Sequence, residues 1–168
     1  MKEITIKDST LSQAASEGMD AFVQVFADAV NEAIGGQLTA ESMSELNGHQ
    51  MTLLAYMILR EEVMDGGFIQ LIHNGYGEFF FKNPFAKAMR LWGLDDLAKL
   101  MNKVRKSYVK NHEEIEKDVT DEEFMSLFEQ HPEYDEHDDC FVENEEAWTE
   151  AVAHYIDENI DSFAKIVE

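Results

Sequence analysis

Apolar residues recur every three or four positions through most of this chain, a spacing that is typical of helices with one buried face. Pairs of glycines and Asn-Gly pairs interrupt the spacing and indicate where helices end. We therefore predict an all-α fold in which residues 1–168 form a single compact multi-helix domain. The predicted helices begin near residues 9 or 12, 39, 48, 68, 84, 95, 120 and 143.

The first predicted helix runs from Ser9 or Ser12 to about Ile34, where Gly35-Gly36 ends it. Before it, the alternation of Ile4-Thr5-Ile6 is typical of a short strand, although no partner strand is evident. One face of this helix carries the apolar residues Ala15, Met19, Phe22, Phe26, Ala29, Val30 and Ala33.

A helical pattern stops at Asp65-Gly66-Gly67 and restarts at Phe68. Two adjacent glycines allow a positive φ without a steric penalty, so the backbone can turn sharply there. Asn74-Gly75 ends the second segment, and we predict a buried helix–corner–helix with Phe68 fixed just after the bend. A phosphate-binding loop is not predicted, because the sequence has no GxxxxGK[ST] pattern here and no strand precedes the glycines.

The corner also carries the pattern E-V-x-x-G-G-F-x-Q-x-x-x-N, at Glu62, Val63, Gly66, Gly67, Phe68, Gln70 and Asn74. This pattern resembles the signature of the bacterial nineteen-kilodalton DNA mimic protein family, and the similarity extends over residues 46–166. The resemblance implies an α-helical homodimer whose acidic surface occupies the DNA-binding face of a transcriptional regulator. It implies architectural roles at the corner for Glu62, Gly66, Gly67, Phe68, Gln70 and Asn74.

Aromatic residues cluster after the corner, at Tyr76 and at Phe79-Phe80-Phe81. Such a cluster is either a part of the core or an exposed platform for a ligand, and we favour the core. The next long helix, from Asp95 to about Tyr108, has an apolar stripe and an opposite basic stripe. We interpret the basic stripe as a solvated face or as partial neutralisation of the acidic part, rather than as a nucleic-acid site. It consists of Lys99, Lys103, Lys106 and Lys110.

Charge is unevenly distributed along the chain, whose formal net charge is −22. Residues 1–111 hold 11 Lys and Arg against 14 Asp and Glu, whereas residues 112–168 hold 2 against 21, a net of −19. This acidic third includes a final helix predicted from about Glu143. A surface of that charge repels nucleic acid and anionic lipid, so we expect a basic protein partner, no direct binding of nucleic acid and no membrane contact.

The amino-terminal residues show no apolar region of a signal peptide, and the longest apolar run, 51–59, is too short to span a membrane. A single cysteine, Cys140, cannot form an intrachain disulfide and is typical of a reducing compartment. We therefore expect a cytoplasmic protein.

The sequence predicts no catalytic, cofactor or metal site, and we expect a protein that is not an enzyme. An EF-hand loop is excluded near residue 135, because Cys140 stands where the loop requires glycine. One cysteine and two histidines, His131 and His137, are too few for a structural zinc site. The carboxylates around Cys140 should raise its pKa, which is the wrong direction for a nucleophile.

An exposed row of carboxylates remains as the candidate functional feature, because its members recur at helical spacing opposite the apolar face. The competing interpretation is a surface that only keeps the protein soluble; a net of −19 in one third of the chain and the family resemblance favour binding. The predicted partner-binding residues are Asp135, Glu136, Asp138, Asp139, Glu143, Glu146, Glu150, Asp157 and Asp161.

Two other functions stay open at this point. An immunity-type inhibitor of a nuclease toxin would use the same electrostatics against a different basic partner. A small-molecule binder or an enzyme would instead use a pocket near Phe68 and Tyr76, with His73 or Glu62 as a perturbed titratable group.

Overall fold

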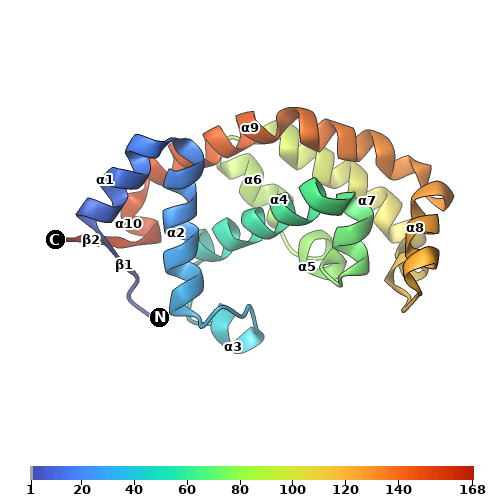
Figure 1. The fold of residues 1–168 in the computed structure, drawn as a ribbon, viewed down its shortest axis with the longest axis horizontal. Coiled ribbons are helices and arrows are strands. Elements are labelled where there is room, and N and C mark those ends of the chain that lie inside the picture. Colours follow the sequence, from blue (N-terminus) through green and yellow to red (C-terminus); the bar gives the residue numbers. More distant parts are fainter. Residues whose placement is uncertain (1) are drawn as a thin grey trace. The chain divides into compact units, whose positions relative to one another are not determined.

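The computed structural model describes residues 2–168 and is built almost entirely of α-helices (Figure 1). The predicted all-α fold is thereby confirmed. The chain forms two compact units, a first unit of residues 1–57 and 146–168 and a second unit of residues 58–145. Both boundaries fall inside long helices, α4 (Gly48–His73) and α9 (Asp135–Glu158).

The first unit contains both ends of the chain (Figure 1). Its further elements are β1 (Thr5–Lys7), α1 (Asp8–Glu17), α2 (Met19–Ala33), α3 (Ala40–Met43), α10 (Ile160–Phe163) and β2 (Lys165–Val167). The two strands pair in parallel, with Ile6 opposite Ile166. The predicted strand near residue 5 therefore exists, and its partner escaped the sequence analysis because three residues are too few to show an alternating pattern.

The prediction of one helix from residue 9 or 12 to residue 34 is wrong, because Gly18 separates α1 from α2. Gly18 has φ 125° and ψ 178°, a conformation that residues with a side chain rarely adopt. The break changes which residues face inward, and Met19 is 41% exposed instead of buried. The buried residues of α2 are Val23, Phe26, Ala27 and Val30.

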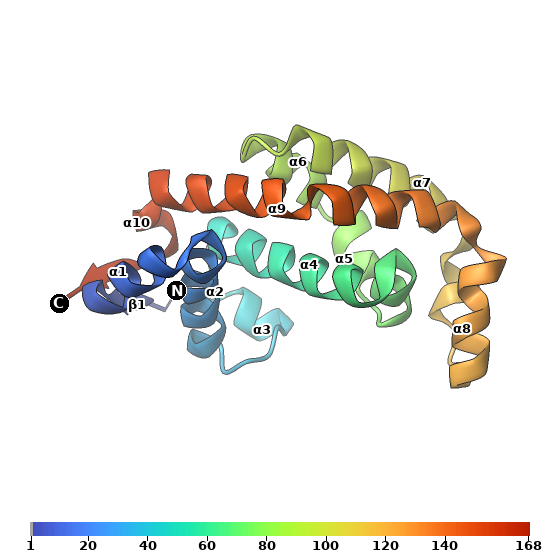
Figure 2. The ribbon, with the colours of Figure 1, turned by 45° about the horizontal axis from the view of Figure 1, so that its top comes forward.

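The second unit holds the corner of α4, the start of α9 and the helices between them. Those helices are α5 (Gly77–Phe81), α6 (Phe85–Leu91), α7 (Asp95–Glu116), α8 (Asp121–Gln130) and the short 3-10 helix η1 (Pro132–Tyr134). α6 packs along α7 (Figure 2). The apolar stripe predicted for α7 is buried as expected, at Leu97, Leu100, Met101, Val104 and Tyr108.

Two members of the aromatic cluster after the corner belong to the core of the second unit. Phe80 and Phe81 are 2% and 5% exposed, and the ring of Phe80 meets that of Phe85 edge to face at 5.1 Å. Gly77 leaves room for this packing, because a Cβ there would lie 2.4 Å from the ring of Tyr108. The core interpretation is confirmed for Phe80 and Phe81, whereas Tyr76 and Phe79 are half-buried.

The final long helix begins eight residues earlier than predicted, at Asp135 rather than near Glu143. The acidic composition of residues 132–142 is typical of a loop. The carboxylates of Asp135, Glu136 and Asp138 nevertheless lie in the first turn of α9, where they stabilise the helix by interacting with the positive end of its dipole. The apolar face of this part depends on one residue, Phe141, which is fully buried. A single buried residue does not make a periodic pattern, so the start of α9 is not evident from the sequence.

Candidate acidic binding surface

Helix α9 carries a carboxylate row in the first unit. Its inner face is buried through Val152 and Ile156, so residues on the opposite side point outward. No Lys or Arg in residues 2–168 forms an ion pair with this row; Glu150 only approaches His154, at 3.8 Å. The first-unit row consists of the exposed residues Glu146, Glu150 and Asp157 of α9 and Asp161 of α10.

A hollow of about 260 Å³ lies beside this row in the same unit. Met19 and Phe22 from α2 give it an apolar wall, and Asp157 and His154 from α9 lie at its edge. The side chain of Met19 is well exposed although it is large and apolar. A carboxylate row beside an apolar hollow can hold both the charged head and the aliphatic stem of an arginine or lysine.

The amino-terminal half of α9 carries a second group of carboxylates, which belongs to the second unit. Within the described chain, no cationic side chain forms an ion pair with the exposed members of this group. The second-unit row consists of the exposed residues Asp135, Glu136, Asp139 and Glu143.

Asp138, the ninth residue predicted to bind a partner, lies in a different environment. It is half-buried, and its Oδ1 accepts a hydrogen bond of 2.8 Å from the backbone N–H of Phe68. Burial raises its pKa from 3.8 to about 6, against the opposing effect of that hydrogen bond, and Asp135 and Asp139 raise it further. Asp138 therefore supports the corner of α4, and we do not include it in the exposed rows.

Both glycines of the corner are required by their surroundings. Gly66 (φ −145°, ψ 16°) and Gly67 (φ 74°, ψ −176°) interrupt the helical backbone of α4, as predicted. A Cβ on Gly66 would lie 2.0 Å from Oε1 of Gln70, and a Cβ on Gly67 would lie 2.4 Å from Oδ2 of Asp138. At both positions, a neighbouring side chain therefore occupies the space that a Cβ would need.

The polar residues of the corner motif bind one another across the bend. Oε2 of Glu62 accepts a hydrogen bond from Nε2 of Gln70 and another from Nδ2 of Asn74, both at 2.9 Å. Nε2 of Gln70 also donates to Asp65 at 3.0 Å. The carboxylate of Glu62, before the glycines, thus accepts hydrogen bonds from two amide side chains after them. These hydrogen bonds stabilise the angle of the corner.

Phe68 fills the inner side of the corner. Its side chain is fully buried, and its ring stands perpendicular to that of Phe141 at 6.3 Å. Nδ1 of the nearby His73 contacts the backbone oxygen of Ile115 at 2.8 Å. The hollow beside the first-unit row contains neither Phe68 nor Tyr76, so it does not support the alternative of a small-molecule pocket there.

One carboxylate of structural importance, Glu145, was not among the residues predicted from the sequence. It is 7% exposed and contacts Arg60 through a hydrogen-bonded ion pair. Glu145 lies one helical turn after Phe141 and one before Thr149, on the buried face of α9. The spacing of the predicted helix already indicated this position, because Glu145 precedes Trp148 by three residues and Val152 by seven.

The thiol and the acidic residues form no evident reactive site in the described chain. No group of three or more His, Cys, Asp or Glu in residues 2–168 is arranged to hold a metal ion. Burial raises the pKa of Cys140, as do Glu143 and Asp96, while Lys103 lowers it. The predicted direction is therefore correct, although burial contributes more than the carboxylates. Within the described residues, no helix has the length and apolarity to cross a membrane.

Comparison with known proteins identifies relatives of this arrangement. The model of a family described as "DMP19-like protein" matches residues 44–159, which include the corner and nearly all of α9. A relative from Neisseria meningitidis serogroup B, the DNA mimic protein DMP19, is 37% identical over 128 residues. The aligned part covers 75% of this chain and 77% of that protein.

Proposed function

Because the chain belongs to the DMP19-like family, we propose that it is a non-enzymatic DNA mimic that binds a basic DNA-binding protein, such as a transcriptional regulator, in place of DNA. The exposed carboxylates take the role of backbone phosphates. On a helix, side chains three or four positions apart have Cβ atoms about 5–6 Å apart, so a row presents regularly spaced negative charges.

One observation carries this proposal: the carboxylates of both rows are exposed and have no Lys or Arg partner within residues 2–168. A surface that serves only solubility needs a net charge of about 2–8 on a small domain. The acidic third carries −19. An unneutralised surface of this charge destabilises the free protein and is relieved when a basic partner binds.

Capture of the partner is the first experiment. The immobilised protein is exposed to a lysate of its own organism at low salt and eluted in steps of rising salt. We expect a basic DNA-binding protein to elute at moderate salt, because charge-driven binding weakens as screening increases. Addition of duplex DNA at constant salt should displace the same protein. A partner that binds DNA and the immobilised protein simultaneously would contradict mimicry.

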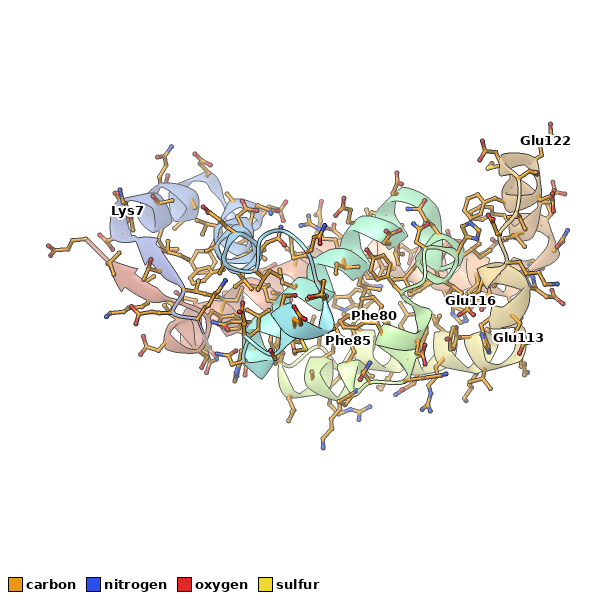
Figure 3. The ribbon with its side chains drawn as sticks, turned by 90° about the horizontal axis from the view of Figure 1, so that it is seen from below. Lys7, Phe80, Phe85, Glu113, Glu116 and Glu122 are labelled. Atoms are coloured by element: carbon orange, nitrogen blue, oxygen red, sulfur yellow. The ribbon has the colours of Figure 1, made fainter. Side chains whose placement is uncertain are left out.

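A charge-reversal variant then locates the surface. Glu146→Lys, Glu150→Lys and Asp157→Lys together should weaken partner binding by at least about 100-fold, since close charge pairs contribute a few kcal/mol each. The matched control reverses Glu113, Glu122 and Glu129, which are exposed, lie outside both rows and change the net charge equally. Glu122 projects from α8 in Figure 3. Equal loss of binding in the two variants would show that only total charge matters.

The same capture experiment separates the proposal from the immunity-type function. If the captured protein is a nuclease whose activity this chain blocks, the acidic rows serve as an inhibitor of that enzyme. If the chain and DNA do not compete for any captured protein, the mimic function is wrong.

Two further properties belong to this proposal. We propose that the protein is a cytoplasmic homodimer, because the family resemblance implies a dimer and the lone Cys140 is typical of a reducing compartment. Sedimentation velocity at several concentrations checks the dimer against the monomer mass of 19.3 kDa.

A further inference from the structure

The second unit contains a strongly basic region within this acidic protein. Residues 79–112, which form most of α5 together with α6 and most of α7, hold 8 Lys and Arg against 2 Asp and Glu. The chain as a whole holds 13 Lys and Arg, so most of its positive charge is concentrated here. In Figure 3, several nitrogen-tipped side chains project outward from the yellow-green helices α6 and α7.

Part of this charge surrounds a pocket of about 220 Å³, which we call the basic pocket. Lys87 and Arg90 reach it from α6, and Arg105 reaches it from α7. The side chains of Asn83 and Asn102 add amide groups to its wall.

The three cations of the basic pocket are not neutralised by the protein. In the part of the chain that the structure describes, none of Lys87, Arg90 and Arg105 forms an ion pair or a side-chain hydrogen bond. In the same region Lys82, by contrast, contacts Glu78 at 3.2 Å. Three like charges around one pocket repel one another, and among the described residues no Asp or Glu forms an ion pair with them, although the chain has 35.

Apolar residues also take part in the lining of the pocket. They are Phe80, Phe81 and Met101, which are otherwise buried in the core. Figure 3 shows Phe80 beside Phe85, between the ribbons of α5 and α6. A ligand in this pocket would therefore meet cationic groups together with the exposed edges of apolar residues, which suits a molecule with an anionic head and an organic body.

We propose that the basic pocket binds a small phosphate-bearing organic molecule, with its phosphate between Arg90, Arg105 and Lys87 and its organic part against Phe80 and Phe81. Guanidinium groups match phosphate oxygens in pairs of parallel hydrogen bonds, and the lysine adds a point charge. This site is separate from the acidic rows and does not depend on the proposed mimic function.

A long nucleic acid is a less suitable occupant than a small phosphate. Charges act over about 8 Å at physiological ionic strength. A small molecule in the pocket is influenced mainly by the three nearby cations, whereas a duplex would extend over a protein whose net charge is −22. The local charge thus favours a compact anion, and the total charge opposes a polymeric one.

The test uses NMR titration of the full chain with two probes, pyrophosphate and adenosine monophosphate, at about 150 mM salt. We expect saturable shifts of the side-chain signals of Arg90, Arg105 and Asn102, with tighter binding of the nucleotide because it also contacts the apolar residues of the lining. Arg90→Gln with Arg105→Gln should raise the dissociation constant at least about tenfold. The matched control, Lys99→Gln with Lys106→Gln, removes the same charge from exposed residues of α7 outside the pocket and should change it less than about threefold.

Three results would overturn the proposal. The first is an absence of saturation with both probes, and the second is equal weakening by the two double variants, which would indicate diffuse attraction. The third is that a duplex of about 20 base pairs, whose length exceeds the pocket, binds more tightly than the nucleotide and loses affinity in the same variant. That outcome would identify the region as a nucleic-acid surface. Far-UV circular dichroism confirms that each variant is folded.

Discussion

Gly67 combines two constraints that no other residue type satisfies together. Its φ of 74° with ψ of −176° lies in a region that is almost restricted to glycine, and the carboxylate of Asp138 occupies the position of a Cβ. The sequence predicted the bend from the glycine pair itself. It could not predict Asp138 as the neighbour, because the two residues are 71 positions apart and no local pattern connects them.

The two constraints at Gly67 can be separated by substitution. Gly67→Ala should destabilise the protein by about 3 kcal/mol or more, as it adds a clash to the backbone strain. Gly35→Ala is the matched control, because Gly35 has the same φ of 74° but nothing within 4 Å of a Cβ, and it should cost about 1–2 kcal/mol. Urea unfolding of both variants measures the difference. Equal costs would mean that Asp138 moves away freely.

Asp138 should also make stability depend on pH. Its pKa is raised to about 6 in the folded protein, from 3.8, so the folded state holds this proton more tightly than the unfolded chain. Stability from this residue is therefore present below about pH 4 and is lost as the pH rises through about 6. Asp138→Asn stays neutral and keeps an oxygen for the N–H of Phe68.

The stability of this variant relative to the wild type should increase by roughly 1–2 kcal/mol between about pH 4 and pH 7, since solvent reduces the full effect of a half-buried group. Urea unfolding at both pH values measures it. Asp139→Asn, at an exposed neighbouring position, should show little change. A relative stability of Asp138→Asn that is independent of pH would contradict the role of burial.

At the scale of whole elements, the sequence predicts a helix well where several apolar residues repeat, as in α7. The sequence predicts the helix boundaries poorly where a boundary depends on one residue. Gly18 divides a continuous apolar pattern into α1 and α2, and Phe141 alone supports the first turns of α9. Buried and exposed carboxylates are also difficult to distinguish from the sequence. Glu145 and Glu146 are adjacent residues of the same type, and they differ in the face of α9 on which they lie.

These adjacent glutamates give a direct test of the face assignment. Glu145→Ala should cost about 2–3 kcal/mol, because Glu145 is buried and Arg60 loses the carboxylate that it contacts. Glu146→Ala should change stability by less than about 0.5 kcal/mol, because its side chain is exposed. Thermal unfolding distinguishes them, and equal effects would contradict the orientation of α9. Under the proposed function, only Glu146→Ala should weaken binding without lowering stability.

For the whole molecule, the charge distribution was the most informative feature of the sequence. The positions of the charges in the chain predicted an acidic face, and eight of the nine expected residues lie exposed on α9 and α10. The basic pocket was not predicted, since its cations come from two helices, and only the packing of α6 on α7 brings Arg90 and Arg105 to one cavity. A pocket between helices has no periodic pattern in the sequence.

The single domain predicted for residues 1–168 has its own test, because each unit contains one tryptophan. Trp148 lies in the first unit and Trp92 in the second, and both are buried. Since α4 and α9 each continue from one unit into the other, melting of either unit must unwind helices that the other uses. We therefore propose that the chain unfolds as one cooperative domain.

In Trp92→Phe the fluorescence reports only on the first unit, and in Trp148→Phe only on the second. For each variant the fluorescence midpoint in urea should coincide with the midpoint from far-UV circular dichroism, which follows all helices. Adding Glu145→Ala, a change in the second unit, should then shift the fluorescence midpoint of the first unit by the same amount as that of the second. A shift confined to the second unit would show two independently folding domains, with the chain able to open at the boundaries inside α4 and α9.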